Sequence, residues 1–184
     1  MSQPIILHWR TEDLKNLPDN GNRYEIINGE LFVTRAPHWR HQKVSGRINT
    51  ELDLWSRTSQ LGEPIINPGV IFTEADSVIP DVVWISYERL ESAVDESGHL
   101  TASPELVVEV LSLSNESVDR QNKLDLYSSQ NVDEYWIVDW RAQQIEIYRR
   151  QGGTLQLATT LITTGTLSSP LLPGFACPVN QLFA

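Results

Sequence analysis

Two acidic residues stand where a buried strand would normally carry apolar side chains. Glu109 lies inside the apolar run 106–111, and Asp81 opens the run 82–85 directly after Pro80. Strands buried on both faces of a sheet are usually apolar throughout. An unpaired carboxylate in such a strand would be strongly destabilising or would have to bind a proton. Both carboxylates therefore need a partner.

A divalent cation is one partner that both carboxylates could share. If the two strands are neighbours, Asp81 and Glu109 converge on one point, and a cation there removes both their repulsion and the cost of burial. Mg²⁺ or Mn²⁺ suits such a site, because these ions prefer oxygen ligands and Mg²⁺ keeps several waters. Taken alone, each residue has an equally good structural explanation. Asp81 would then be a turn former, and Glu109 an edge residue facing solvent or an arginine.

Three polar residues share one face of the helix expected at 117–129. Asp119, Lys123 and Tyr127 are spaced by four, which places them one above the other. The simplest interpretation is a surface ion pair between Asp119 and Lys123, worth about 0.5 kcal/mol or less. The alternative is that Lys123 reaches over the strand ends to the carboxylates. A fixed ammonium there can orient a metal-bound water or stabilise charge on a phosphate.

A basic segment interrupts this acidic chain. No acidic residue lies between Glu30 and Glu51. The same window contains Trp39 and four basic side chains, which are Arg35, Arg40, Lys43 and Arg47. These side chains are suited to contact phosphates, and Trp39 to stack on a base. An exposed basic helix start that balances acidic neighbours explains the pattern nearly as well.

Three further polar residues have both a functional and a structural interpretation. Glu30 follows a predicted turn and can be a solvated strand residue. His41 lies near the start of a long helix and can be a capping or packing histidine. Asp139 ends an apolar run, and we expect it to begin the turn that follows.

The elements that must position these residues follow from apolar periodicity and from Gly and Pro. An Asn-Gly pair at 28–29 between apolar runs predicts a hairpin of 24–27 with 30–34. A stripe of apolar residues from Val44 to Trp55 predicts a long helix at 41–61, ended by Gly62.

The other expected elements complete a mixed α/β pattern. Short helices are expected at 11–17 and 88–94, and strands at 65–67, 70–72, 80–85, 105–111, 134–139, 145–148 and 155–161. We therefore predict a single α/β domain over residues 1–184, with a central mixed sheet flanked by helices and an N-terminal β-hairpin.

Length and charge limit the possible functions. The chain has 184 residues and a net charge of −10, so it is no general binder of polyanions, and work on nucleic acid needs local basic surface. A single cysteine, Cys177, excludes an intrachain disulfide. Residues 1–8 carry no signal-peptide pattern, and no apolar run approaches the ~20 residues of a membrane span. We expect a cytoplasmic protein without a membrane partner.

Many of these residues belong to one ordered series of motifs. The series is Tyr24–Glu30, His41 opening a helix, Pro80–Val83, Pro104–Ser112, Lys123 with Tyr127, Glu134–Asp139 and Leu172–Phe175. In this order the motifs closely resemble the Uma-two family of restriction-endonuclease-like proteins, over nearly the whole chain. That family belongs to the PD-(D/E)XK nuclease superfamily. The resemblance implies a restriction-endonuclease-like core, with the site at the mouth of the sheet.

The resemblance also implies roles for individual residues. Asp81 matches the aspartate of the PD motif, and Glu109 matches the acidic residue of the second half-motif. The lysine expected two residues later is absent, since that position is Leu111. In this family the lysine looks to have moved to the following helix, which points to Lys123.

The resemblance implies a metal-dependent endonuclease that hydrolyses DNA phosphodiester bonds. Asp81, Glu109 and the carbonyl of Val110 would hold one Mg²⁺ or Mn²⁺, and Lys123 would position the nucleophile or stabilise charge. The basic side chains of the segment 35–47 would hold the DNA backbone. A homodimer is expected by analogy, because cutting both strands of a duplex takes two sites.

Other functions compete with this one. Glu30 and His41 match further recurrent polar positions of the family, as possible accessory residues. A nuclease fold without turnover that binds DNA or a protein partner fits the net charge of −10 somewhat better. Hydrolysis of a small phosphoester also fits an acidic surface. A zinc hydrolase is disfavoured, because no two histidines have ligand spacing on one helix.

Overall fold

The chain is built around a six-stranded sheet. The structure, a computed structural model, describes residues 8–112 and 116–184. The strands of this sheet follow the order β10-β9-β8-β7-β6-β3. β7 and β8 are parallel, and the other neighbours are antiparallel. The mixed α/β fold expected from the sequence is therefore present.

The strands and helices have the following bounds. The strands are β1 (Arg23–Ile27), β2 (Glu30–Thr34), β3 (Gly62–Ile66), β4 (Val70–Thr73), β5 (Asp76–Val78), β6 (Val82–Ser86), β7 (Leu106–Val110), β8 (Glu134–Asp139), β9 (Gln144–Gln151), β10 (Thr154–Ile162), β11 (Thr166–Leu167) and β12 (Cys177–Pro178). The helices are α1 (Trp39–Ser59), α2 (Tyr87–Leu90), α3 (Lys123–Ser129) and α4 (Val179–Phe183). A 3₁₀ turn, η1, spans Thr11–Asn16, and a π-helical turn, η2, spans Val118–Asn122.

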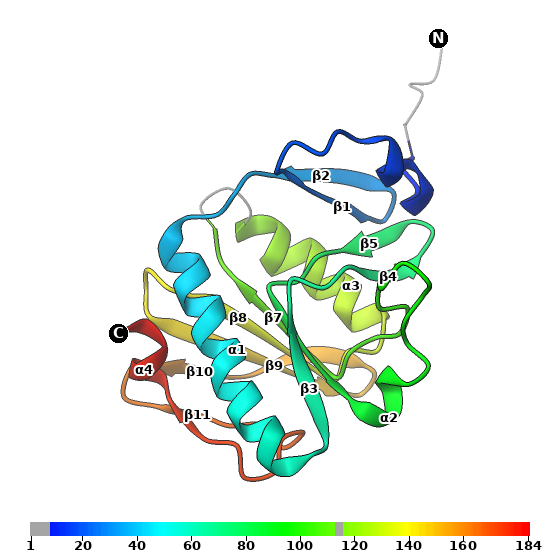
Figure 1. The fold of residues 1–184 in the computed structure, drawn as a ribbon. Coiled ribbons are helices and arrows are strands. Elements are labelled where there is room, and N and C mark those ends of the chain that lie inside the picture. The colour runs from blue at the N-terminus through cyan, green and yellow to red at the C-terminus, as the bar shows by residue number, and fades with distance from the viewer. Residues whose placement is uncertain (1–7, 113–115) are drawn as a thin grey trace.

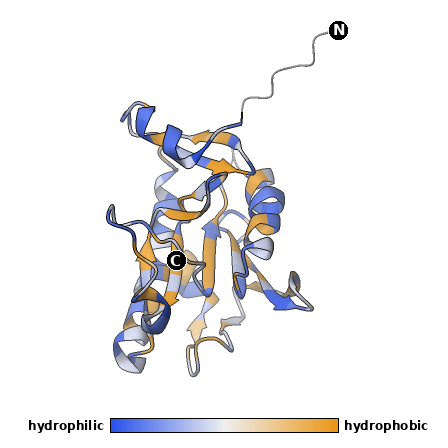
Figure 2. Ribbon diagram, turned by 90° about the vertical axis from the view of Figure 1, so that its right-hand side faces the viewer, coloured by the Kyte–Doolittle hydropathy of each residue, from blue (hydrophilic) through white to orange (hydrophobic). Residues whose placement is uncertain are grey.

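The central sheet is covered on both faces (Figure 1). On one face Val82 and Val108 pack with the buried stripe of α1, and on the other Val83 and Val107 pack with α3. Each buried Val, Leu or Ile contributes about 1.5–3 kcal/mol. Figure 2 shows hydrophobic residues concentrated along the central strands. Two-sided burial explains why these strands are nearly continuous apolar runs.

The long helix α1 packs through a regular stripe. Val44, Ile48 and Leu52 are at most 4% exposed, as their spacing of four predicts. The helix ends two residues earlier than expected, at Ser59, because Gln60 caps it in the left-handed conformation with φ 57°. Gly62 begins β3 instead, where an added Cβ would lie 2.3 Å from the carbonyl oxygen of Ile85.

A second, four-stranded sheet with the order β2-β1-β5-β4 lies across one end of the central sheet (Figure 1). Its hairpin of β1 and β2 turns at Asn28 and Gly29, which have φ of 52° and 76°, as the Asn-Gly pair predicts. The strands expected at 65–67 and 70–72 separate into the two sheets, as β3 and β4. β1 is thereby held above the ends of β6 and β7.

A π-helical turn interrupts the helix expected at 117–129. Residues Val118–Asn122 form this turn, and regular α-helix resumes at Lys123. Such turns are rare and are often found at functional sites. Within the described residues, no helix is long and apolar enough to cross a membrane.

A candidate active site at the end of the central sheet

The two carboxylates singled out in the sequence lie opposite one another. β6 and β7 are antiparallel, with Val82 opposite Val108. Extending this register by one residue places Asp81 opposite Glu109. Both side chains are buried, at 2% and 3% exposure. The strand ends thus bring together two acids that are 28 positions apart in the chain.

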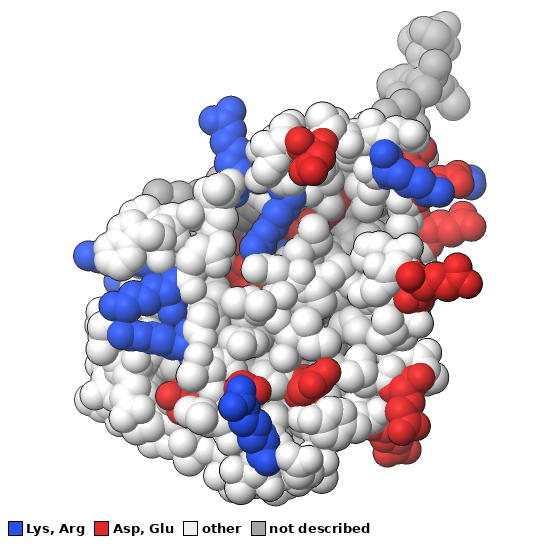
Figure 3. All heavy atoms as spheres, viewed as in Figure 1, with Lys and Arg blue, Asp and Glu red and all other residues white. Residues whose placement is uncertain are grey.

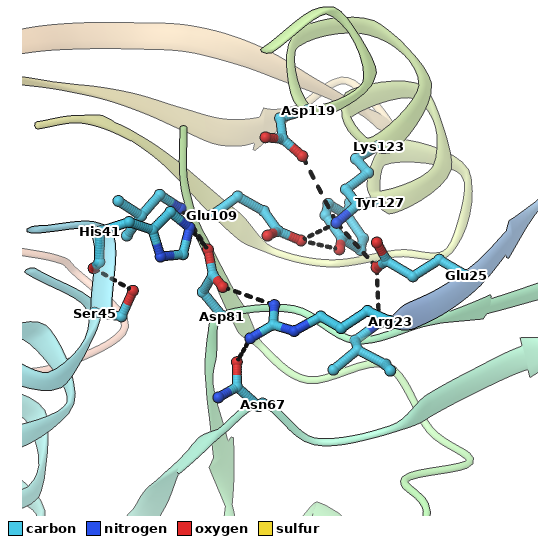
Figure 4. A network of polar contacts seen from close by, with 12 residues as sticks. Arg23, Glu25, His41, Ser45, Asn67, Asp81, Glu109, Asp119, Lys123 and Tyr127 are labelled. Atoms are coloured by element: carbon cyan, nitrogen blue, oxygen red, sulfur yellow. Dashed lines mark hydrogen bonds and ion pairs between the residues drawn. The ribbon is translucent and has the colours of Figure 1, made fainter. Parts of the chain in front are cut away.

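The carboxylate of Asp81 contacts three polar groups, each from a different element (Figure 4). One carboxylate oxygen, Oδ1, lies 3.0 Å from the guanidinium of Arg23 on β1. The other, Oδ2, lies 3.0 Å from Nε2 of His41 on α1 and accepts the backbone N–H of Val110 at 2.9 Å. The second nitrogen of His41, Nδ1, is buried without a hydrogen-bond partner among the described residues.

These contacts stabilise Asp81 as a carboxylate. Burial alone would raise the pKa of Asp81. The hydrogen bond and charge of His41, the Val110 amide and the charge of Arg23 outweigh that effect and hold the pKa below its ordinary value. One of the structural explanations open at the sequence level, a carboxylate paired with an arginine, thus applies to Asp81 rather than to Glu109.

Glu109 is paired with a buried lysine. Nζ of Lys123 lies 2.8 Å from Oε1 of Glu109, and the hydroxyl of Tyr127 donates to the same oxygen at 2.8 Å. Lys123 is only 3% exposed. The ion pair expected between Asp119 and Lys123 is present at 3.6 Å. It is buried, however, and does not lie at the surface as expected. α3 turns this lysine toward the strand ends.

Two more carboxylates complete the cluster. Oε1 of Glu25, on β1, lies 3.0 Å from Lys123 and accepts the backbone N–H of Ile79 at 2.8 Å. Asp119, in the π-helical turn, faces Lys123 from the other side (Figure 4). We call Arg23, Glu25, His41, Asp81, Glu109, Asp119, Lys123 and Tyr127 the acidic cluster.

The acidic cluster carries more negative than positive charge. Its four carboxylates face two permanent cations, Arg23 and Lys123. Burial, together with repulsion from the other acids, raises the pKa of Glu109 well above its ordinary value against the attraction of Lys123. The same causes raise the pKa of Asp119 to about 7. The pKa of Lys123 is itself well above normal: burial lowers it, but the attraction of the surrounding carboxylates prevails.

The donor set of the acidic cluster fits a hard divalent cation. Its potential ligands are carboxylate oxygens, which Mg²⁺ and Mn²⁺ prefer, and its excess negative charge is what a cation would neutralise. No three His, Cys, Asp or Glu side chains in residues 8–112 and 116–184 form a ready-made cage. Mg²⁺ needs only one or two carboxylates beside its waters. An ion at Asp81 would have to compete with Arg23.

A pocket of about 400 Å³ opens onto the acidic cluster. Asp81, Glu109 and Lys123 form its floor, and His38 and Trp140 line it as well. A substrate group entering this pocket would therefore meet both carboxylates and the lysine.

The structure does not bring every predicted residue to the pocket. Glu30 is exposed beside the hairpin turn, and the acidic residue that β1 and β2 contribute is Glu25. Arg47 points elsewhere, because its guanidinium donates to the backbone carbonyls of Leu182 and Ala184. Asp139 accepts the N–H groups of residues 141 and 142, so it forms the expected turn.

Of the other basic residues of the segment 35–47, Arg35 lines the pocket, whereas Arg40 and Lys43 are exposed and are not among its lining residues. Sequence reasoning missed Arg23 and Glu25 as site residues. Glu25 lies in the strand predicted at 24–27 and Arg23 just before it, and their separation by two residues puts both on one face of β1. That spacing does not indicate that this face meets the site.

Comparisons with known proteins agree with this architecture. A family model described as "Uma2: Putative restriction endonuclease" matches residues 11–180. "Uncharacterized protein sll1609" of Synechocystis sp. is 26% identical over 140 residues, which cover 75% of this chain and 78% of that protein. The crystal structure of "a putative nuclease belonging to DUF820" from Anabaena variabilis has a TM-score of 0.79 at 16% identity, covering 95% of this chain and 97% of that one. This last likeness establishes the fold.

Proposed function

Because this chain belongs to the Uma2 family, we propose that it is a metal-dependent nuclease that hydrolyses phosphodiester bonds of DNA at the acidic cluster. The observation that carries the proposal is the opposition of Asp81 and Glu109 at the floor of a pocket, with the buried Lys123 2.8 Å from Glu109. A cluster that only stabilised the fold would have little need for a pocket that reaches it.

The residues of the cluster would have different roles in the reaction. Asp81 and Glu109, with the carbonyl of Val110, would hold Mg²⁺ or Mn²⁺, which when bound supplies a Lewis acid and a more acidic water. Lys123 keeps its proton, because the surrounding carboxylates raise its pKa. It therefore offers a fixed positive charge beside the scissile phosphate.

Two neighbouring side chains keep this arrangement in place. Tyr127 donates to Glu109 and fixes the orientation of that carboxylate. Arg23 lines the pocket and points its guanidinium at Asp81. A phosphate group entering the pocket would offer Arg23 a second anion, and this exchange would free an oxygen of Asp81 for the metal.

The test is cleavage of supercoiled and of single-stranded circular DNA with Mg²⁺, with Mn²⁺, or with a chelator. We expect nicking that requires the metal and that is lost in Asp81→Asn, Glu109→Gln and Lys123→Met. The matched control is Asp53→Asn, which removes a carboxylate on α1 that pairs with Arg57 away from the pocket. This variant should cleave like the parent.

The contrary result is equally specific. DNA binding without cleavage under either metal would mean that the fold serves as a binding module, and the nuclease proposal would be abandoned. Cleavage that survives in all three site variants would place the activity elsewhere or in a contaminant. The homodimer stays a prediction, tested by sedimentation with and without duplex DNA.

A further inference from the structure

An aromatic cluster lies beside the same pocket, and two of its four members, His38 and Trp140, line that pocket. The rings of His38 and Trp140 are stacked, with centroids 5.1 Å apart and an interplanar angle of 10°. Trp39 lies beside them, with its ring centroid 5.7 Å from that of His38. The guanidinium of Arg40 lies 5.2 Å from the Trp39 ring centroid and 6.0 Å from that of Trp140. We call His38, Trp39, Arg40 and Trp140 the aromatic platform.

The platform is both anchored and exposed. The indole N–H of Trp140 donates to the carbonyl of Leu111 at 3.0 Å, just past the end of β7. His38 caps α1 by accepting the N–H of Arg40 at 3.2 Å. Trp39, in contrast, is 61% exposed. A large ring fixed to a helix start and left open to water is suited to receive another flat group.

The surroundings of the platform favour an anionic ligand. Arg40 within the platform is exposed, as are Arg35 and Lys43, each three residues in the sequence from the nearest platform residue, and residues 31–50 contain no acid. Figure 3 shows basic side chains gathered at the left of this face, beside the start of α1, while acidic side chains lie mainly along its right edge and its lower part. A ligand that combines flat rings with negative charge therefore matches this part of the surface.

We infer that the aromatic platform is a stacking subsite for an unpaired nucleobase, so that the preferred substrate is single-stranded DNA. The inference rests on the proposed function, because His38 and Trp140 line the pocket whose floor is Asp81 and Glu109. A base stacked on the platform would have its own phosphate at the mouth of that pocket.

Duplex DNA fits this arrangement poorly. Within a duplex, each internal base has both faces covered by its neighbours, so only the two terminal pairs leave a face on which Trp39 could stack. An unpaired base has free faces, and stacking on an aromatic side chain contributes about 1–3 kcal/mol per base. Arg40 adds a cation close to the same rings. The subsite would therefore favour single-stranded over duplex DNA without favouring a particular base sequence.

The experiment measures binding of fluorescently labelled short oligonucleotides by anisotropy, without a divalent cation and again with Ca²⁺. Three probes are compared: a single strand, the same strand with abasic positions, and the duplex. We expect the parent protein to bind the normal single strand most tightly. Trp39→Ala should weaken that binding about ten- to a hundred-fold. Trp39→Phe, which keeps an aromatic ring, should retain most of the parent's affinity.

Two controls separate stacking from charge and from folding. The abasic strand keeps the phosphates, so its weaker binding should barely change in Trp39→Ala. Leu54→Ala removes another exposed apolar side chain of α1 (56% exposed) and should bind all probes like the parent. Equal binding of abasic and normal strands, equal binding of duplex, or no effect of Trp39→Ala would each overturn the inference.

The outcomes also separate this inference from the nuclease proposal. Metal-dependent nicking together with Trp39-independent binding would overturn the subsite and leave the nuclease. Trp39-dependent binding of single strands without any cleavage would overturn the nuclease and leave the subsite.

Discussion

Lys123 lies within ion-pair distance of three carboxylates, those of Glu25, Glu109 and Asp119. Lys123 is buried at 3% exposure, so water solvates neither its ammonium nor the partner carboxylates to any large extent. The acids depend on this ammonium, and its removal leaves them uncompensated. A buried charge that loses its partner is much more costly than an exposed one.

We therefore predict that Lys123→Met lowers the free energy of unfolding by about 3–5 kcal/mol. Adding Glu109→Gln should recover part of that loss, because one orphaned carboxylate is neutralised. Arg57→Met serves as the control: its partner Asp53 lies at the surface, and exposed pairs contribute about 0–1 kcal/mol. Urea denaturation measures all three, and equal losses for Lys123→Met and Arg57→Met would contradict the buried network.

Asp119 makes stability depend on pH. Its pKa rises from an ordinary value of 3.8 to about 7 on folding, first because of burial. The folded chain thus holds this proton more tightly than the unfolded chain, so stability is highest at low pH and falls as pH rises between these two values. Asp119→Asn should raise the free energy of unfolding at pH above about 7 by up to about 4 kcal/mol and change little near pH 4.

This comparison needs a chelator in both buffers, so that no divalent cation compensates the acids. Unfolding followed at a series of pH values gives the two curves directly. Parallel curves for the parent and Asp119→Asn would show that Asp119 is not protonated on folding.

Arg23 competes with a cation for Asp81. Its guanidinium lies 3.0 Å from Oδ1 of Asp81 and also bonds the side chain of Asn67. We predict that Arg23→Gln binds Mn²⁺ several-fold more tightly than the parent in calorimetric titration, because one oxygen of Asp81 is released. Arg89→Gln, which changes an arginine paired with Glu105, is the control. Weaker binding in Arg23→Gln would mean that Arg23 helps to build the site.

Some of these residues could be predicted from the sequence and some could not. Glu109 stands out because it interrupts an apolar run, and Asp81 because it opens one. The spacing of Lys123 is explained most simply by a surface ion pair, and its place in the site is implied by the family resemblance. Arg23 and Glu25 belong to a short strand whose own pattern is ordinary. Their place in the site depends on how the second sheet packs on the first, which no local pattern encodes.

At the scale of elements, α1 connects the core to the site. α1 places His41 beside Asp81, and its start carries three residues of the platform, His38, Trp39 and Arg40. The buried apolar stripe of α1 packs the helix against the sheet. The helix and its apolar face followed from periodicity. Its end did not, because the left-handed cap is a glutamine, Gln60, and glutamine is no sequence signal for that conformation. The π-helical turn likewise had no signal.

We predict that Ile48→Ala lowers the free energy of unfolding by about 2–5 kcal/mol, because Ile48 is 1% exposed and leaves a cavity. Leu54→Ala on the same helix should change stability by less than about 0.5 kcal/mol, since Leu54 is 56% exposed. Thermal or urea unfolding distinguishes the two. Similar losses would contradict the packing described for α1.

At the scale of the whole molecule, basic side chains are concentrated in one segment of a chain that is acidic overall. The chain carries a net charge of −10, yet its basic segment and its acidic cluster meet at one pocket. Composition predicted that nucleic-acid binding would need local basic surface. It could not place the two parts together, because Arg35, His38 and His41 meet the carboxylates of the acidic cluster only through the sheet order and the helix packing.

The measurement that tests the account most directly is calorimetric titration of the protein with Mn²⁺. We expect one ion per chain in the parent and in Asp53→Asn, and loss of that binding in Asp81→Asn and in Glu109→Gln. Undiminished Mn²⁺ binding in both site variants, or none in the parent at any pH at which the acids are ionised, would contradict a shared cation at Asp81 and Glu109.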